Sequence, residues 1–331
     1  MKALLNRLFN HETLTKAEAA EVLTHIAQGA YNPAQIASFI TVYLMRSITV
    51  EELDGFREAM LALCVPAPLS DYRPIDLCGT GGDGKDTFNI STLASFVVAA
   101  SGVAVAKHGN YGVSSISGSS TVLEYFGVKF SNDADQLRRQ MDATGLCFLH
   151  APLFHPALKN VGPIRKELGI KTFFNMLGPM VNPAAPPYQL VGVFSAELAR
   201  LYAYLYQQTN KRFSILHSLD GYDEISLTGA FKWLSNEGER ILEPDALGMP
   251  QYRPEDLFGG ATVADAAAIF AQVLQGQGTA AQTDAVVANA GMAIHCARPD
   301  TSLLDCLTQA RESLLSGQAL QTFERFVALA S

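Results

Sequence analysis

The sequence predicts an α/β protein in which a small helical domain precedes a larger domain with a mainly parallel central sheet. Two observations support this fold class. Most of residues 1–64 carry a helical pattern of apolar residues without a strand signal. From Pro74 onward, short apolar runs alternate with helical segments, which is typical of βα units. We therefore expect a helical domain at 1–70, joined by helices from about 155–185, and an α/β domain at 71–331.

Helix caps divide the N-terminal segment into about four short helices. The patterns Thr15-x-x-Glu18 and Thr49-x-x-Glu52 are capping boxes, and Asn32 is a cap followed by a proline at the first helical position. Such a small bundle has little apolar interior of its own. We therefore expect it to pack against the rest of the chain or against another subunit.

Apolar runs after Pro74 predict the strands of the sheet. They lie at 75–77, 103–106, 146–149, 189–194 and 213–216. Residues 231–234 and 240–242 predict a hairpin, and helices return after Thr262. Because ligands bind at the carboxyl ends of the strands in sheets of this type, the loops after these strands are the expected sites of chemistry.

The loop after the first predicted strand is rich in glycine and precedes a helix. Four glycines occur within residues 79–84, so backbone N–H groups there can face an anion with no Cβ in the way. The G-x-G-x-x-G pattern lacks the acidic residue about 20 positions later that a dinucleotide site needs. The Walker pattern fails at Asp86, where a hydroxyl should bind magnesium. A phosphate-binding loop of another kind and a plain surface turn remain open.

A second loop, 107–120, follows the next predicted strand and leads into a helix from about Ser120 to Phe126. Lys107 and five serines supply donors for a second anionic group. Two such loops at the end of one sheet suggest a ligand with two separate phosphates. A serine-rich surface turn is the alternative.

Two further segments carry candidate ligand-binding side chains. Asp223 and Glu224 follow the strand at 213–216 and could hold a hard cation such as Mg²⁺, because a polyphosphate brings its metal and needs only one or two protein carboxylates. An ordinary acidic turn is the alternative. The Gly- and Pro-rich segment 154–183 could place His155 and Arg165 over the crevice, and a single arginine can bind a carboxylate. A surface ion pair for Arg165 and a core role for His155 are the alternatives.

Composition excludes several classes of protein. The net charge of −8 and the pI near 5.4 disfavour nucleic acid and anionic membranes as partners. The five cysteines are scattered without a C-x-x-C pair, which indicates reduced thiols. The N-terminus lacks a signal-peptide pattern, and the run 93–106 falls short of the ~20 residues that a membrane span needs. We expect a cytoplasmic protein without a membrane segment.

Several motifs, in order, resemble the anthranilate phosphoribosyltransferase family, which has the nucleoside phosphorylase/phosphoribosyltransferase fold. The resemblance runs from the N-terminal helices to the last ones. It is carried by Gly79-Thr80-Gly81-Gly82-Asp83, Asn89-Ile90-Ser91-Thr92, Lys107-His108-Gly109-Asn110, Ser114-Ser115, Gly118-Ser119, Arg165-x-x-Leu168-Gly169, Thr172-Phe173-Phe174-Asn175, Leu177-Gly178-Pro179, Asn182-Pro183 and Asp223-Glu224.

The resemblance implies Mg²⁺-dependent transfer of phosphoribosyl from phosphoribosyl pyrophosphate to anthranilate, the second step of tryptophan biosynthesis, by a homodimer formed through the helical domain. It places the phosphoribosyl pyrophosphate site at Gly79, Gly82, Asp83, Thr87, Asn89, Ile90, Ser91, Thr92, Lys107, His108, Gly109, Asn110, Tyr111, Gly112, Val113, Ser114, Ser115 and Ser119. It places the metal at Ser91, Asp223 and Glu224. It places anthranilate at Gly79, Asn110, His155, Arg165, Gly178 and Pro179, with Arg165, Asn110 and His108 orienting the acceptor.

The chain departs from the usual family pattern in the second loop. The family usually has arginine at Tyr111, lysine at Ile116 and alanine-aspartate at Ser120-Thr121. These changes could mark a subfamily with compensating contacts or a changed acceptor. Two alternative functions stay open: a pyrimidine nucleoside phosphorylase of the same fold, against which Arg165 and the carboxylate pair argue, and a non-catalytic nucleic-acid-binding relative, against which the net charge argues.

Overall fold

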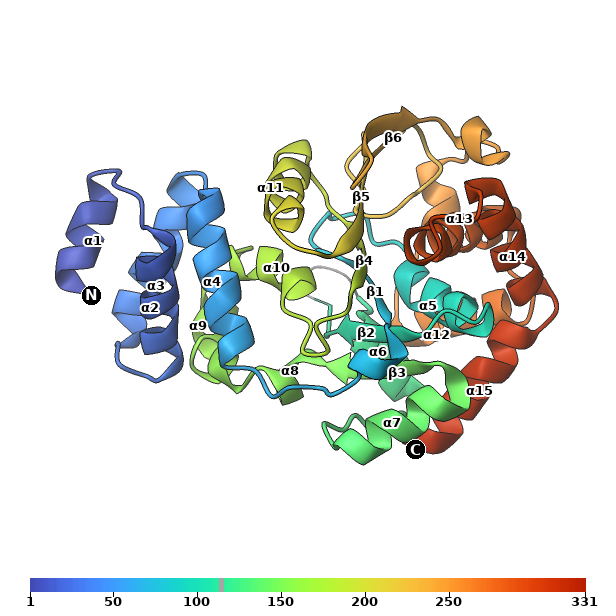
Figure 1. Ribbon diagram of the computed structural model, residues 1–331, viewed down its shortest axis with the longest axis horizontal. Helices are drawn as coiled ribbons and strands as arrows, with labels where there is room; N and C mark the ends of the chain where they lie inside the picture. The colour runs from blue at the N-terminus through green and yellow to red at the C-terminus, as the bar shows by residue number, and fades with distance from the viewer. Residues whose placement is uncertain (113–115) are drawn as a thin grey trace. The chain divides into compact units, whose positions relative to one another are not determined.

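The computed structural model describes residues 1–112 and 116–331 (Figure 1). The chain divides into two compact units. The helical unit comprises residues 1–66 and 151–183, and the α/β unit comprises residues 67–150 and 184–331.

The helical unit starts with four helices, as predicted. They are α1 (Lys2–Phe9), α2 (Lys16–Ala27), α3 (Pro33–Met45) and α4 (Val50–Ala62). Capping boxes at Thr15, Asn32 and Thr49 start α2, α3 and α4, which confirms the predicted caps. The second segment of the unit contains α8 (Ala151–Phe154), η2 (Pro156–Asn160), α9 (Gly162–Leu168), α10 (Phe174–Leu177) and η3 (Gly178–Met180).

The core of the helical unit is aromatic and needs both segments of the chain. Phe39, Tyr43 and Phe56 from α3 and α4 pack on one another, and all three contact Phe173 from the second segment. The rings of Phe56 and Phe173 are stacked with their centroids 4.6 Å apart. Burying one such side chain contributes about 1.5–3 kcal/mol. The N-terminal helices are therefore completed by a segment that lies about 100 residues later in the chain.

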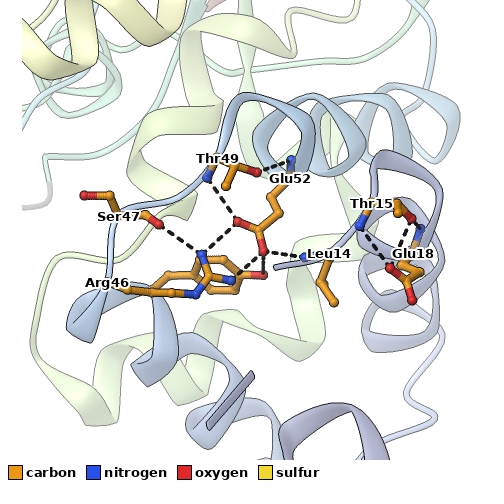
Figure 2. A network of polar contacts seen from close by, with 8 residues as sticks. Leu14, Thr15, Glu18, Arg46, Ser47, Thr49 and Glu52 are labelled. Carbon is orange, nitrogen blue, oxygen red and sulfur yellow. Dashed lines mark hydrogen bonds and ion pairs between the residues drawn. The ribbon is translucent and has the colours of Figure 1, made fainter. Parts of the chain in front are cut away.

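A buried carboxylate ties the ends of these helices together (Figure 2). Glu52 is fully buried and accepts hydrogen bonds from the backbone amides of Leu14 at 2.9 Å and Thr49 at 3.0 Å. Arg46, at the end of α3, pairs with the same carboxylate, and the Tyr43 hydroxyl also donates to it. One side chain thus fixes the start of α4, the end of α3 and the loop before α2.

The described part of the α/β unit contains a seven-stranded sheet with the order β3-β2-β1-β4-β5-β6-β7. Neighbours from β3 to β5 are parallel, and the hairpin β6–β7 extends the sheet antiparallel. The strands are β1 (Ile75–Gly79), β2 (Val105–Gly109), β3 (Leu146–His150), β4 (Tyr188–Gly192), β5 (Arg212–Ser218), β6 (Phe231–Ser235) and β7 (Gly238–Leu242).

The predicted strands are all present, but β2 was placed too early. It was expected at 103–106, whereas it runs from Val105 to Gly109. Lys107 and His108 therefore lie in the strand, not in the loop that follows. Both side chains are buried, and β2 stays paired with β3 as far as Gly109 and His150. Because these two residues are polar, the run of apolar residues alone predicted that the strand ends before them.

Helices cover both faces of the sheet. Figure 1 shows α11 (Ala196–Gln207) on one side of the strands, with α5 (Ile90–Ala100) and α13 (Ala280–Ala297) on the other. Most of α13 is buried, with Val286, Val287 and Ile294 fully enclosed. The remaining elements are η1 (Ser70–Tyr72), α6 (Ser119–Tyr125), α7 (Ala134–Thr144), η4 (Pro244–Leu247), η5 (Pro254–Leu257), α12 (Val263–Leu274), α14 (Leu303–Leu315) and α15 (Gln318–Ala330). Among the described residues, none of the helices has the length and apolar character to cross a membrane.

Candidate active site

The acidic loop lies directly on the carboxyl ends of β1 and β4. Gly79 and Gly192 end these strands and are register partners. A Cβ added at Gly79 would lie 2.3 Å from Asp223 Oδ2, and one added at Gly192 would lie 1.5 Å from the Asp223 carbonyl oxygen. Strands β1 and β4 are adjacent in the sheet although β2 and β3 lie between them in sequence, so this is the point where the strand order reverses. Ligands bind at such points in open α/β sheets.

Gly192 was not among the candidate residues, because its importance depends on a contact that the sequence does not reveal. We expect Gly192→Ala to displace the acidic loop and lower kcat/KM by about tenfold or more, since the added methyl overlaps backbone and not a flexible side chain. Steady-state kinetics would measure this effect. Gly229→Ala is the matched control, because a Cβ there would have no atom of the described residues within 4 Å apart from its own chain neighbours. Equal activities of the two variants would contradict the prediction.

The two carboxylates join the first glycine-rich loop to the start of α5. Asp223 Oδ2 accepts a hydrogen bond from the Gly81 amide at 2.6 Å. Glu224 Oε1 accepts one from the Ser91 amide at 2.9 Å, in the first turn of α5. The partial positive charge of a helix N-terminus favours an anion at that position. Gly81 and Gly82 have φ angles of +68° and +80°, which favour glycine.

Burial and neighbouring negative charges disfavour the ionised forms of Asp223 and Glu224. Burial, together with the nearby Asp83 carboxylate, raises the pKa of Asp223 to about 7. Burial, followed by the charges of Asp223 and Asp83, raises the pKa of Glu224 well above its ordinary value. Asp83 Oδ2 is also buried without a hydrogen-bond partner among the described residues. Ionised carboxylates are costly in such a place unless a cation neutralises them.

These residues fit a bound Mg²⁺ ion that takes further ligands from its substrate. No group of three or more His, Cys, Asp or Glu side chains forms a metal cage in the described part of the chain. Mg²⁺ does not require one, because it is commonly held by one or two carboxylates together with phosphate oxygens and water. The carboxylates of Asp223 and Glu224 and the hydroxyl of Ser91 supply hard oxygen donors of this kind.

A buried lysine lies beside the same residues. Lys107 Nζ donates to the Leu77 carbonyl oxygen at 2.5 Å and contacts Ser91 Oγ at 3.4 Å. Burial lowers its pKa, while nearby acidic groups, including Glu224, act in the opposite direction. The end of β2 therefore brings an amine to the start of α5, close to the predicted metal ligand Ser91.

Hydrogen bonds join the N-cap of α5 to the second loop and also form within that loop. Asn89 Nδ2 donates to the Ser117 carbonyl oxygen at 2.9 Å. The Asn110 carbonyl oxygen accepts from Ser119 Oγ at 3.2 Å and from the Ser120 amide at 3.1 Å. The start of α5, which follows the first loop, thus lies beside the second loop. Val113, Ser114 and Ser115 fall outside the described residues.

Tyr111 occupies one of the positions where the family pattern has a cation. Its hydroxyl donates to Glu124 Oε1 at 2.7 Å, and its ring meets that of His150 edge-on at 5.0 Å. The His150 Nδ1 atom in turn lies 2.8 Å from Ser120 Oγ. Two of the four unusual residues, Tyr111 and Ser120, therefore contact the same histidine. Ile116 is about half exposed.

The other residues predicted to bind the donor substrate in this region lie in different environments. Thr87 forms an isolated β-bridge with Phe258, and Gly82 lies in the first loop. Ile90 and Thr92 are almost fully buried in α5, so their side chains belong to the interior of the unit. Gly112 packs closely on Gly118, where an added Cβ would overlap the Gly112 amide nitrogen.

The predicted acceptor-binding residues His155, Arg165, Gly178 and Pro179 belong to the helical unit. Arg165 Nη2 donates to Asn175 Oδ1 at 3.1 Å, and its guanidinium lies over the Phe174 ring. Burial lowers the pKa of Arg165, its Nε atom is buried without a hydrogen-bond partner, and it forms no ion pair within the described ranges. A half-buried guanidinium with no carboxylate partner among the described residues fits an anionic ligand.

Comparison with known proteins agrees with this arrangement. Residues 71–320 match the α/β domain of a glycosyl transferase family, and residues 2–64 match its helical bundle domain. The anthranilate phosphoribosyltransferase of Cytophaga hutchinsonii is 60% identical over 99% of this chain and 100% of its own length. That of Flavobacterium psychrophilum is 61% identical over 98% of each chain. The chain belongs to the anthranilate phosphoribosyltransferase family.

Solved structures of anthranilate phosphoribosyltransferases share the fold. The enzyme from Thermus thermophilus has a TM-score of 0.91 and 34% identity, with 98% of each chain covered. The enzyme from Saccharomyces cerevisiae, in complex with PRPP and Mg, has a TM-score of 0.89 and 26% identity, with 98% of this chain and 96% of that chain covered. The predicted fold class and the family resemblance are thus confirmed.

Proposed function

We propose that the chain transfers the phosphoribosyl group of 5-phosphoribosyl 1-pyrophosphate to the amine of anthranilate. The products are N-(5-phosphoribosyl)anthranilate and pyrophosphate, in the second step of tryptophan biosynthesis from chorismate. One observation supports this most directly: Asp223 and Glu224 bind backbone amides of both the glycine-rich loop and the start of α5. Acidic side chains at an amide-lined anion site are suited to a phosphate ligand that arrives with a metal.

In this proposal, the α/β unit binds the donor substrate. Amides of the first loop and the start of α5, together with Lys107, face the pyrophosphate and the ribose phosphate. Ser91, Asp223 and Glu224 hold Mg²⁺, which when bound neutralises charge on the pyrophosphate. The remaining donor-binding positions are Gly79, Gly82, Asp83, Thr87, Asn89, Ile90, Thr92, His108, Gly109, Asn110, Tyr111, Gly112, Val113, Ser114, Ser115 and Ser119.

The family resemblance assigns the orientation of the acceptor to Arg165, Asn110 and His108, and it adds Gly79, His155, Gly178 and Pro179 to the acceptor-binding residues. Arg165 binds the anthranilate carboxylate, which leaves the amine free to attack C1 of the ribose. As the new C1–N bond forms, the C1–O bond to pyrophosphate breaks, and the amine releases its proton to water. Positioning and stabilisation of the leaving group suffice for this step, so a strong general base is not required.

We expect Arg165→Ala to raise KM for anthranilate by roughly 10- to 100-fold, because a charge-assisted hydrogen bond contributes about 1.5–3 kcal/mol. KM for phosphoribosyl pyrophosphate should stay within about twofold of the native value. Steady-state kinetics with each substrate varied in turn measures both constants. Lys166→Ala, at the exposed neighbouring position, is the control. Equal increases in both constants would contradict a carboxylate-binding role for Arg165.

The proposed reaction can be tested by following the loss of anthranilate fluorescence in the presence of phosphoribosyl pyrophosphate, with and without Mg²⁺. We expect turnover that requires both the donor and the metal. The phosphorylase alternative predicts no anthranilate turnover and phosphorolysis of a pyrimidine nucleoside instead. Nucleic-acid binding would be detected as a salt-sensitive gel shift, which we do not expect from a chain with a net charge of −8.

We also propose that the enzyme is a cytoplasmic homodimer formed through its helical unit. A groove of about 480 Å³ on this unit is lined by apolar side chains of α1 and α3, including Leu8, Phe9, Val42 and Met45. Phe9 is 57% exposed and Met45 81% exposed. Large apolar side chains gathered at such a surface favour association, and the family resemblance identifies a second copy as the partner.

We expect Met45→Glu to shift the protein from dimer to monomer, because the change places a charge in an apolar contact. Size-exclusion chromatography with light scattering at matched concentrations measures the mass. Ile241→Glu, at a 58% exposed position in the α/β unit, should leave the dimer intact. A Met45→Glu variant that stays dimeric would count against the helical unit as the interface.

A further inference from the structure

A line of polar contacts crosses the interior of the sheet and ends at the backbone amide of His108 in β2. Lys211, just before β5, donates from Nζ to Gln189 Oε1 on β4 at 3.3 Å. Gln189 Nε2 donates to Asp76 Oδ2 on β1 at 3.3 Å. Asp76 Oδ1 accepts from the backbone amide of His108 on β2 at 3.0 Å. The residues thus follow the order β5-β4-β1-β2 across four adjacent strands.

The donor and acceptor atoms of each side chain fix which group donates in each hydrogen bond of this line. A lysine ammonium can only donate, so Gln189 presents its oxygen to Lys211 and its NH₂ group to Asp76. An ionised Asp76 can only accept: Oδ2 accepts from Gln189 and, at 3.8 Å, from Cys78 Sγ, and Oδ1 accepts from the His108 amide. Asp76 and Gln189 are completely buried and are direct register partners. Water therefore cannot readily replace a contact that is lost.

These contacts hold the end of β2. Strands β1 and β2 are in register at Ile75 and Val105. Farther along, side chains join the two strands: Asp76 binds the His108 amide, and Lys107 binds the Leu77 carbonyl oxygen. The segment held in this way contains His108 and leads directly to Asn110, both of which the proposed function places beside the acceptor.

We infer that Asp76 is a positioning residue for the transfer reaction. It is fully buried, and it sets the height and direction of the end of β2 through the His108 amide. This inference rests on the proposed function, since the roles of His108 and Asn110 come from it. The consequence is that the polarity of Asp76, and not only its volume, controls how well the acceptor is oriented.

The test moves the negative charge from position 76 to position 189. Asp76→Asn keeps the shape but turns an NH₂ group toward either Gln189 or the His108 amide, so two donors face each other. Adding Gln189→Glu should repair the line, because the introduced carboxylate accepts from Lys211 and from the introduced amide NH₂ group. The oxygen of that amide then again accepts from the His108 backbone. The double variant has the same net charge as the native protein. Cys147→Ala, which changes a buried thiol on β3 outside the line, is the control.

We expect Asp76→Asn to lower kcat by about tenfold or more, and the double variant and Cys147→Ala to stay within about threefold of the native enzyme. Hydrogen–deuterium exchange of the peptide containing His108 should be faster in Asp76→Asn and restored in the double variant. A purely structural role would lower Tm but leave the kcat of the folded Asp76→Asn variant unchanged, which would overturn the inference.

A double variant that fails to fold or fails to recover kcat would also overturn the inference. If Asp76→Asn itself does not fold, the double variant alone still decides the test. The activity of the native enzyme is measured first and tests the proposed function separately. The exchange measurement needs no activity, so unchanged exchange at His108 in Asp76→Asn would refute the positioning contact whether or not the proposed reaction is correct.

Discussion

Asp223→Asn is expected to lower kcat/KM for phosphoribosyl pyrophosphate by about 100- to 1,000-fold. Loss of one group that stabilises charge in a transition state costs about 2.7–4 kcal/mol in comparable sites. Asparagine keeps the shape of aspartate but removes a charged metal ligand, and its NH₂ group can face the Gly81 amide that now donates to Asp223. Initial rates measured at saturating anthranilate and varied Mg²⁺ and phosphoribosyl pyrophosphate would report the effect.

Asp220→Asn provides the matched comparison for this experiment. Asp220 belongs to the same acidic segment but is exposed. Its carboxylate accepts a hydrogen bond from the Thr228 hydroxyl. We expect kcat/KM for Asp220→Asn to stay within about threefold of the native value. If the two variants lose activity equally, the specific metal-binding role of Asp223 is wrong.

Glu52→Gln should have the largest effect on stability. Removing one partner of a buried ion pair costs about 3–5 kcal/mol, because the remaining charge is left uncompensated. Here Arg46 would lose its partner, and the amides of Leu14 and Thr49 would compete for a single acceptor oxygen. We expect the denaturation midpoint in urea to fall markedly, as followed by circular dichroism. Glu51→Gln, at the exposed preceding position on α4, should change it little.

The pH dependence of this contribution has a definite sign. Burial acts to raise the pKa of Glu52, but the hydrogen bonds from Arg46, Leu14 and Thr49 outweigh it, so the pKa in the folded protein is lowered. The stabilisation is thus present above the ordinary glutamate pKa of 4.5 and is lost as pH falls through the lower folded value. The difference in midpoint between native protein and Glu52→Gln should shrink in acid. A constant difference would contradict this account.

Local signals in the sequence predicted most of the fold. The capping residues Thr15, Asn32 and Thr49 act through contacts three residues away, so their patterns are visible in the chain itself. The extent of β2 could not be predicted in the same way. Lys107 and His108 look like loop residues until Leu77 and Asp76 on the neighbouring strand are seen to bind them.

The candidate site was predictable where a motif carries its own chemistry. The glycine-rich loop, the Asp223-Glu224 pair and Arg165 could be proposed from residue type and position, and the family resemblance gave each of them a role. The contact between Gly81 and Asp223 joins residues 142 positions apart, and no local pattern encodes it. Gly192 was missed for the same reason, since its lack of a side chain matters only because the Asp223 backbone crosses it.

The most direct test of the central claim is the stoichiometry of the reaction catalysed by the purified native enzyme. Anthranilate loss is followed by fluorescence, and pyrophosphate is quantified in the same samples, with and without Mg²⁺. The proposed mechanism predicts one pyrophosphate released for each anthranilate consumed, and neither change without the metal. Pyrophosphate release without anthranilate consumption, or anthranilate consumption that continues after Mg²⁺ is removed by a chelator, would contradict it.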